Sequence, residues 1–246
     1  GKKKALSCPF LVGSNGIERW FSPSPSGART ITIDRKYPLC SYTTNTWAGM
    51  RGAVFEGSMT EDFSVADTLA VITAVPSYMT TINVSSSKRY RFLRYHAPRL
   101  NRSSLAELLF YTSGDTGDTK LLAGRHFAEG VDSANIGNVF DGNPATICKG
   151  ISVGYTIGLD LGEGNSQSVT KITLSPSTDL NFVEKGHLYE LYCYDTEWKM
   201  LGRVYAHEDK LTFDNVPENA ILLLKDRSGG LEERIFEYRD GKQVWH

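Results

Sequence analysis

The chain has 246 residues, of which 40% are hydrophobic, 11% aromatic and 22% charged, and its formal net charge is −1. This length suggests one or two domains, and the apolar fraction is large enough for real cores, which argues against wholesale disorder. The balanced charge argues against a nucleic-acid partner, and no apolar run approaches the roughly 18 residues of a transmembrane segment. We therefore expect a soluble, globular protein.

The N-terminal segment, residues 1–16, contains three consecutive lysines and is too short to hold the apolar region of a signal peptide. We expect it to be an extension outside the folded modules. The cysteines form no CxxC pair, which argues against a zinc knuckle, and they allow three full pairings among which the sequence does not choose. For Cys193, in a strand-like run, we expect a buried thiol; the others are Cys8, Cys40 and Cys148.

Short strand-like segments follow one another along the chain, separated by Gly, Pro, Ser, Asn and Asp. Many of them alternate polar with apolar residues or are rich in β-branched and aromatic residues, as half-buried strands are. Residues 103–109 could form a helical turn, but their continuation Phe110–Tyr111 favours a strand. The pattern predicts an all-β sandwich or barrel. The expected strands are 30–33, 53–56, 81–84, 90–95, 105–111, 157–161, 170–174, 188–194, 220–224 and 234–238.

The segment 112–119 is small, polar and glycine-bearing, so it predicts a linker that runs over the surface. A division there gives a first module over residues 17–114 and a second module over residues 120–246.

The two halves look distantly alike, because Gly52 and Glu56 in the first half occupy places that match Gly186 and Glu190 in the second. Duplication of one sandwich module is the economical interpretation. Coincidence among β-rich segments is the alternative.

Residues 51–58, 88–95 and 105–111 resemble the discoidin (coagulation-factor type C) module, whose members end in an aromatic- and arginine-bearing strand, a short loop and a closing strand with Ala-Glu. Residues 138–146 resemble the motif that opens such modules, and residues 158–162 resemble the strand after it. The resemblance covers most of residues 17–246. It implies two galactose-binding-like β-sandwich (jelly-roll) modules in tandem, similar to family 32 carbohydrate-binding modules, the first of them divergent.

The C-terminal residues 231–245 resemble the ends of secreted multidomain proteins of gut bacteria, in which discoidin-like modules often follow a transglutaminase-like or hydrolase domain. This resemblance implies export to the periplasm or the outer cell surface, as the accessory part of a larger protein.

The loop 141–146 offers several hard oxygen atoms in a tight turn, which are the ligands that calcium prefers. The family resemblance implies a structural calcium ion held by Asp141, Asn143 and Thr146 and completed by Glu233 near the closing strand. Plain turn chemistry without a metal is the alternative. Glu107 has the corresponding place in the first half, but no partner loop is evident there.

Sugar binding requires an aromatic face beside polar groups, and three loops offer this composition, at residues 42–47, 96–102 and 175–182. In the third loop, related sequences often have an arginine where this chain has Ser177. The alternative for each aromatic residue is packing, which we expect for Trp20, Trp198 and Trp245. The candidate ligand-binding residues are Tyr42, Trp47, Arg99, Asn101, Asp179, Asn181 and Phe182.

No histidine lies in a catalytic motif, and adjacent carboxylates such as Glu61 and Asp62 point to opposite faces of a strand, so they cannot flank one glycosidic bond. We therefore expect no enzymatic activity. The predicted function is a non-catalytic pair of carbohydrate-binding or cell-adhesion modules whose partner is a glycan or glycoconjugate. The alternative is a pair of spacer domains that orient an upstream hydrolase or transglutaminase-like domain and bind no ligand of their own.

Overall fold

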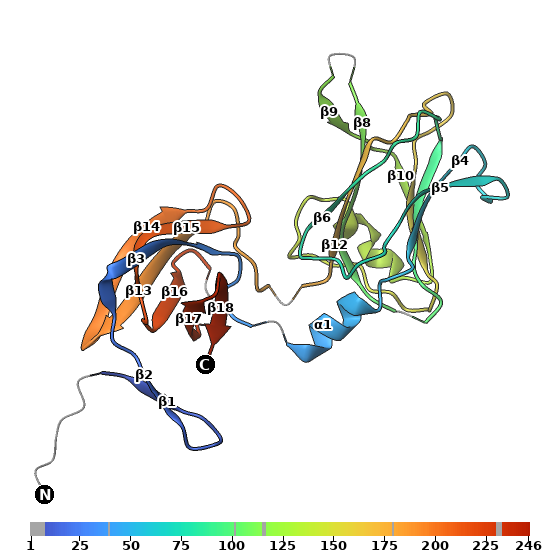
Figure 1. The fold of residues 1–246 in the computed structure, drawn as a ribbon. Helices are drawn as coiled ribbons and strands as arrows, with labels where there is room; N and C mark the ends of the chain where they lie inside the picture. Colours follow the sequence, from blue (N-terminus) through green and yellow to red (C-terminus); the bar gives the residue numbers. More distant parts are fainter. Residues whose placement is uncertain (1–7, 39, 101, 115–116, 179, 230–232) are drawn as a thin grey trace, which may run out of the picture. The chain divides into compact units, whose positions relative to one another are not determined.

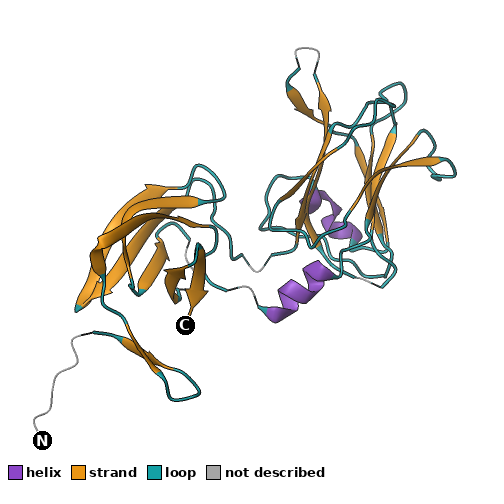
Figure 2. Cartoon of the chain, viewed as in Figure 1, coloured by secondary structure: helices purple, strands orange, loops and turns teal. Residues whose placement is uncertain are grey.

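The computed structural model describes residues 8–38, 40–100, 102–114, 117–178, 180–229 and 233–246. Antiparallel strands are the predominant secondary structure of these residues, and the helices are few, as Figures 1 and 2 show. The prediction of an all-β chain is therefore confirmed. The chain divides into two compact units, which we call unit 1 (residues 1–38 and 181–246) and unit 2 (residues 39–180).

Unit 2 contains two antiparallel sheets that enclose one hydrophobic core. Large apolar side chains such as Phe55, Tyr95, Phe110 and Ile157 are fully buried in this core. One sheet has the order β10 (Arg125–Glu129), β11 (Thr156–Asp160), β7 (Phe92–His96), β4 (Val54–Ser58) and β5 (Ala66–Val71). The other has the order β6 (Thr80–Asn83), β12 (Lys171–Pro176), β8 (Leu105–Ser113) and β9 (Thr119–Leu121). The unit also contains α1 (Ser41–Ala48) and the 3-10 helix η1 (Ser133–Val139).

Unit 1 has its own core, formed by Ile31, Leu191, Phe213, Leu222 and Phe236 among others. Its larger sheet has the order β14 (Glu197–Tyr205), β13 (Leu188–Asp195), β16 (Leu222–Asp226), β17 (Ile235–Arg239) and β18 (Lys242–Trp245). A two-stranded sheet pairs β15 (Leu211–Glu218) with β3 (Ser24–Ile33), and the hairpin β1 (Phe10–Val12) and β2 (Glu18–Trp20) precedes it. Much of the predicted extension, residues 1–16, thus belongs to this hairpin, while residues 1–7 lie outside the described residues.

The predicted boundary between residues 114 and 120 is wrong, because the supposed linker lies in the β8–β9 hairpin. Tyr111 pairs with Leu121 and Ser113 with Thr119. Strands from both sides of this hairpin also pair with each other, β11 with β7 and β12 with β8. A small, polar, glycine-bearing stretch suits a hairpin end as well as a linker, so its composition alone could not distinguish the two.

The predicted loop at residues 42–47 is also wrong, because these residues lie in helix α1. Threonine and tyrosine are weak helix formers, so the sequence gives little helical signal here. The helix is held by Trp47, whose side chain is only 4% exposed and whose Nε1 donates a hydrogen bond to the Ser177 carbonyl oxygen at 2.8 Å. Tertiary packing thus overrides local propensity.

The matching places of Gly52 and Gly186 are confirmed as one local motif that occurs in both units. Each glycine has φ +87°, a conformation that favours glycine. The Gly52 N–H donates to the Ile72 carbonyl at 2.8 Å, and the Gly186 N–H donates to the Ala206 carbonyl at 2.7 Å. Each motif opens a hairpin, β4–β5 in unit 2 and β13–β14 in unit 1. Duplication of a whole module remains a proposal.

We predict that cutting the chain in the β8–β9 hairpin leaves unit 2 assembled. With a protease site inserted between Gly114 and Asp118, the two fragments should co-elute on size exclusion after cleavage, because their strands share both sheets of unit 2 and also pair as β3 and β15 in unit 1. They should separate only in denaturant. Separation of the cut fragments in native buffer would show that this segment is a linker after all.

Candidate functional site

The loop 141–146 follows helix η1 in unit 2 and is closed by its own side chains. Asp141 Oδ1 accepts the Asn143 N–H at 2.8 Å, and Asn143 Oδ1 accepts the Ala145 N–H at 3.1 Å. The Thr146 hydroxyl donates to Asp141 Oδ2 at 2.9 Å. These hydrogen bonds form the metal-free turn that the sequence offered as an alternative to a calcium site. They also bring several oxygen atoms close together.

A buried carboxylate in β8 faces this loop. Glu107 is 1% exposed, and neither of its carboxylate oxygens accepts a hydrogen bond of normal geometry from the part of the chain that the structure describes. Burial raises the pKa of Glu107 to about 8, and repulsion by the Asp141 carboxylate adds to the rise, while the nearby Gly142 N–H opposes it. A buried ionised carboxylate without a partner is costly, so this position favours either a proton or a cation.

A second buried glutamate shows the contrasting arrangement. Glu237 in β17 is paired with Arg19, with Arg239 at 3.7 Å and with His246 at 3.4 Å. Within the described residues, by contrast, no salt bridge reaches Glu107 or Asp141. Unit 1 thus neutralises its buried glutamate with its own side chains, and unit 2 does not.

These observations fit a calcium ion. The Glu107 and Asp141 carboxylates, with oxygens of Asn143 and Thr146, would supply the hard ligands that calcium requires. The fourth predicted ligand, Glu233, belongs to unit 1 and has an ion-pair partner there, since its carboxylate lies 3.4 Å from Lys225 Nζ. Glu107 was noted in the sequence but was not assigned to this loop, because its strand and the loop were expected in different modules.

Three predicted ligand-binding residues have structural roles instead. Trp47 anchors α1, and Phe182 is buried. Asn181 is also buried, and its Oδ1 accepts the backbone N–H groups of Lys36 and Tyr37 at 2.9 and 2.8 Å. Residue type alone could not show that these side chains point inward.

The other four predicted ligand-binding residues do not have such packing roles among the described contacts. Tyr42 is 79% exposed on α1, and Arg99 is exposed in the loop after β7. Asn101 and Asp179 lie outside the described residues.

The tryptophans assigned to packing make ring contacts, although two are partly exposed. Trp20 stacks on Phe10 at 4.6 Å between ring centroids, and Trp198 meets Tyr194 edge-on at 5.4 Å. Trp245 packs against the unit 1 core, and it also lines a cavity that the sequence did not reveal.

This cavity of about 340 Å³ lies in unit 1 beside the β17–β18 hairpin (Figure 1, dark red). The end of β3, the residue before β15 and both strands of the hairpin contribute to its wall. Its aromatic members are Tyr238 and Trp245, and its volume lies within the range of small-molecule sites. We call it the hairpin cavity; its lining residues are Thr32, Asp34, Arg35, Lys210, Tyr238, Gly241, Lys242, Gln243 and Trp245.

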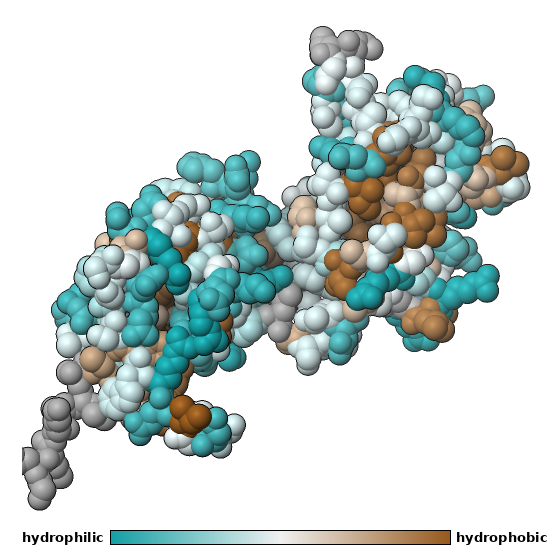
Figure 3. Space-filling model, in the orientation of Figure 1, coloured by the Kyte–Doolittle hydropathy of each residue, from teal (hydrophilic) through white to brown (hydrophobic). Residues whose placement is uncertain are grey.

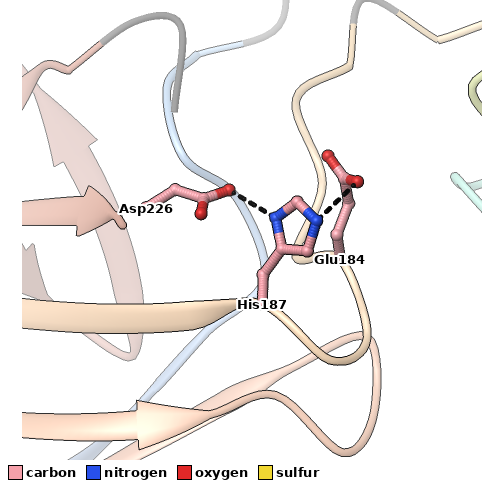
Figure 4. A group of neighbouring side chains, drawn as sticks. All are labelled: Glu184, His187 and Asp226. Atoms are coloured by element: carbon pink, nitrogen blue, oxygen red, sulfur yellow. Dashed lines mark hydrogen bonds and ion pairs between the residues drawn. The ribbon is translucent and has the colours of Figure 1, made fainter. Parts of the chain in front are cut away.

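A third group of polar side chains, Glu184, His187 and Asp226, lies at one end of β13 and β16 (Figure 4). His187 Nδ1 is 3.0 Å from Asp226 Oδ2, and His187 Nε2 is 3.3 Å from Glu184 Oε2. Lys36 Nζ lies 3.6 Å from each carboxylate.

The electrostatics of this group are balanced within unit 1. Burial by itself would raise the pKa of Asp226, but hydrogen bonds from His187 and from the Ser228 and Gly229 N–H groups outweigh it, so the pKa is lowered. Three ligand atoms of the types that metals prefer are present, but the Lys36 ammonium already supplies a positive charge. The group therefore fits a structural ion network.

Comparisons with known proteins give no relative. No family model matches the chain, and neither the curated proteins nor the solved structures contain a significant match. Neither helix in the described part of the chain has the length and apolar character needed to span a membrane. Functional inference thus depends on the residues themselves.

We predict that calcium controls the pH dependence of stability through Glu107. Its pKa is about 8 in the fold and 4.5 in the unfolded chain, so without metal the native state holds the extra proton and stability falls as pH rises between these values. Calcium should raise the melting temperature most at the upper end of this range. Calorimetry in chelator and in calcium measures both effects.

The variant Glu107→Gln should remove the calcium response and should stabilise the metal-free protein near pH 8 by about 4 kcal/mol. Glu233→Gln is the matched control and should respond like the wild type. A calcium response that survives Glu107→Gln would exclude this carboxylate as a ligand.

We also predict that Asp226→Asn lowers the free energy of unfolding by about 3 kcal/mol at neutral pH, because Lys36 and His187 lose a buried anionic partner. Since the pKa of Asp226 is lowered, this stabilisation should disappear as the pH falls below the ordinary value of 3.8. Urea unfolding across pH measures it, with the exposed Asp209→Asn as control. Equal losses in both variants would refute the network.

Proposed function

We propose that this protein is a non-catalytic carbohydrate-binding protein and that unit 1 holds the sugar in the hairpin cavity. The observation that carries the proposal is the composition of this cavity, in which Tyr238 and Trp245 stand beside Gln243 and charged side chains. Sugars have apolar faces edged by hydroxyl groups, so an aromatic surface with adjacent hydrogen-bonding groups suits them.

The backbone supports a stable cavity wall. Asp240 and Gly241, with φ values of +51° and +74°, form the two-residue turn that joins β17 to β18, as in a type I′ hairpin. The Thr32 N–H donates to the Tyr238 hydroxyl at 3.4 Å, which connects β3 to the hairpin. The ring of Tyr238 is therefore oriented before any ligand arrives, which reduces the entropy lost on binding.

In this proposal unit 2 is a calcium-stabilised scaffold. Bound calcium would neutralise the Glu107 and Asp141 carboxylates, and Asn143 and Thr146 would hold the loop around it. The segments that resemble the opening and the closing of a discoidin module, residues 138–146 and 105–111, both belong to unit 2 in reversed chain order. We therefore interpret unit 2 as a circularly permuted galactose-binding-like sandwich.

We further propose that the chain works outside the cytoplasm, in the periplasm or on the outer cell surface, as an accessory part of a larger protein. Calcium sites and glycan ligands suit these compartments, and the sequence resemblance to secreted proteins points the same way.

The spacer function remains a second candidate because of one observation. Trp47, Asn181 and Phe182, the residues first expected to contact ligand, all serve packing or backbone hydrogen bonding. A spacer would consist of two such units with no working cavity.

We predict that Trp245→Ala abolishes glycan binding detected on a glycan array, because it removes half of the aromatic surface. Trp198→Ala, which changes another partly exposed tryptophan of unit 1 outside the cavity, should bind like the wild type. Since Trp245 also contacts the core, Trp245→Phe and circular dichroism control for folding. Absence of any glycan binding by the wild type would favour the spacer.

A further inference from the structure

Two neighbouring cavities of unit 1 share Tyr238 but differ in charge. The first, of about 240 Å³, is lined by three arginines and three acidic residues. Its charges are largely paired, since Arg19 and Arg239 both contact Glu237, and Arg29 lies 3.7 Å from Glu218. This cavity is neutral and offers little to an ionic ligand.

The hairpin cavity has a positive excess. Arg35, Lys210 and Lys242 carry three positive charges against the one negative charge of Asp34, which leaves a formal excess of two. Lys210 and Lys242 are exposed, and within the described residues neither side-chain ammonium group makes a hydrogen bond or an ion pair. Both ammonium groups are therefore available to an anion.

The cavity wall also contains polar atoms without partners. Gln243 Nε2 donates to the Arg35 carbonyl at 3.1 Å, but among the described residues Gln243 Oε1 has no donor and Trp245 Nε1 has no acceptor. Both atoms are shielded from water, where an unmade hydrogen bond costs free energy. A ligand that reached them through a small side-chain movement would recover that cost.

The face of unit 1 seen in Figure 3 is mostly hydrophilic, whereas hydrophobic residues gather on unit 2. On this face, charge and hydrogen bonding, rather than apolar contact, are thus what unit 1 offers to a partner. In the hairpin cavity, the rings of Tyr238 and Trp245 can pack against a sugar ring. The unpaired ammonium groups of Lys210 and Lys242 can bind negatively charged substituents of that ring.

We propose that the hairpin cavity selects acidic saccharides, in which carboxylate or sulfate groups are bound by Lys210 and Lys242 while the ring packs on Tyr238 and Trp245. This inference rests on the proposed function, because it names the class of sugar that the same cavity takes. The shared chemistry is an anionic substituent on a sugar ring, and uronic and sulfated sugars are its two sources.

The test is isothermal titration calorimetry of the full chain with three probes: tetragalacturonic acid, a sulfated heparin tetrasaccharide and neutral maltotetraose. At low salt we expect at least one acidic probe to bind about tenfold more tightly than the neutral one, and we expect added salt to reduce the difference. Because the heparin tetrasaccharide carries carboxylates as well as sulfates, binding of tetragalacturonic acid shows that carboxylates suffice, whereas binding of the heparin probe alone points to sulfate recognition.

The double variant Lys210→Ala/Lys242→Ala should lose about tenfold in affinity for the acidic probe and should bind the neutral probe unchanged. Lys185→Ala, an exposed lysine of unit 1 outside the cavity, is the matched control. A similar loss in the control would show that general surface charge, not this cavity, attracts the probe, and would overturn the inference.

Two further results have distinct meanings. If the neutral probe binds as tightly as the acidic probes, or if the double variant binds all probes like the wild type, the acidic selectivity is wrong while sugar binding stands. If none of the probes binds and a glycan array is also empty, the proposed function itself fails and the selectivity fails with it.

Discussion

The pairing of strands from distant parts of the chain is the constraint on which this structure depends. In unit 2, β7 lies between β4 and β11, and β8 lies between β12 and β9, so both sheets combine residues from before and after the β8–β9 hairpin. Neither segment could bury its apolar face without the other. In unit 1 the same principle applies over a longer range, because β3 pairs with β15. In the sequence, unit 2 therefore lies between the two segments that form unit 1.

This strand pairing places two carboxylates, one of them buried, close together in unit 2. Pairing of β8 with β12 buries Glu107, and the chain after η1 brings Asp141 close to it. Glu237 has Arg19, Arg239 and His246 around it, but Glu107 has no such partners within the described residues. A buried carboxylate retained without a partner suggests an external cation, and the loop oxygens suggest calcium. Stability and metal binding then become one property of the same residues.

Local features of the fold could be predicted from sequence, whereas long-range features could not. The strands at residues 90–95, 157–161 and 188–194 agree with β7, β11 and β13 because alternation is a local signal, and Cys193 is buried as expected. Gly52 could be matched with Gly186 by sequence position, and both lie in turns at φ +87°, a conformation that favours glycine. The unit boundary and the role of Glu107 depend on pairing between segments far apart in sequence. Helix α1 depends on the packing of Trp47, and the hairpin cavity gathers residues from 32 to 245, which no local pattern records.

The function proposed here assigns sugar binding to the hairpin cavity of unit 1 and structural support to unit 2. The most direct test is a crystal structure of the full chain grown with calcium and an acidic oligosaccharide. The account predicts a sugar ring against Tyr238 and Trp245, with its anionic group beside Lys210 and Lys242. An empty cavity at saturating ligand, or a sugar bound only at another surface, would contradict it.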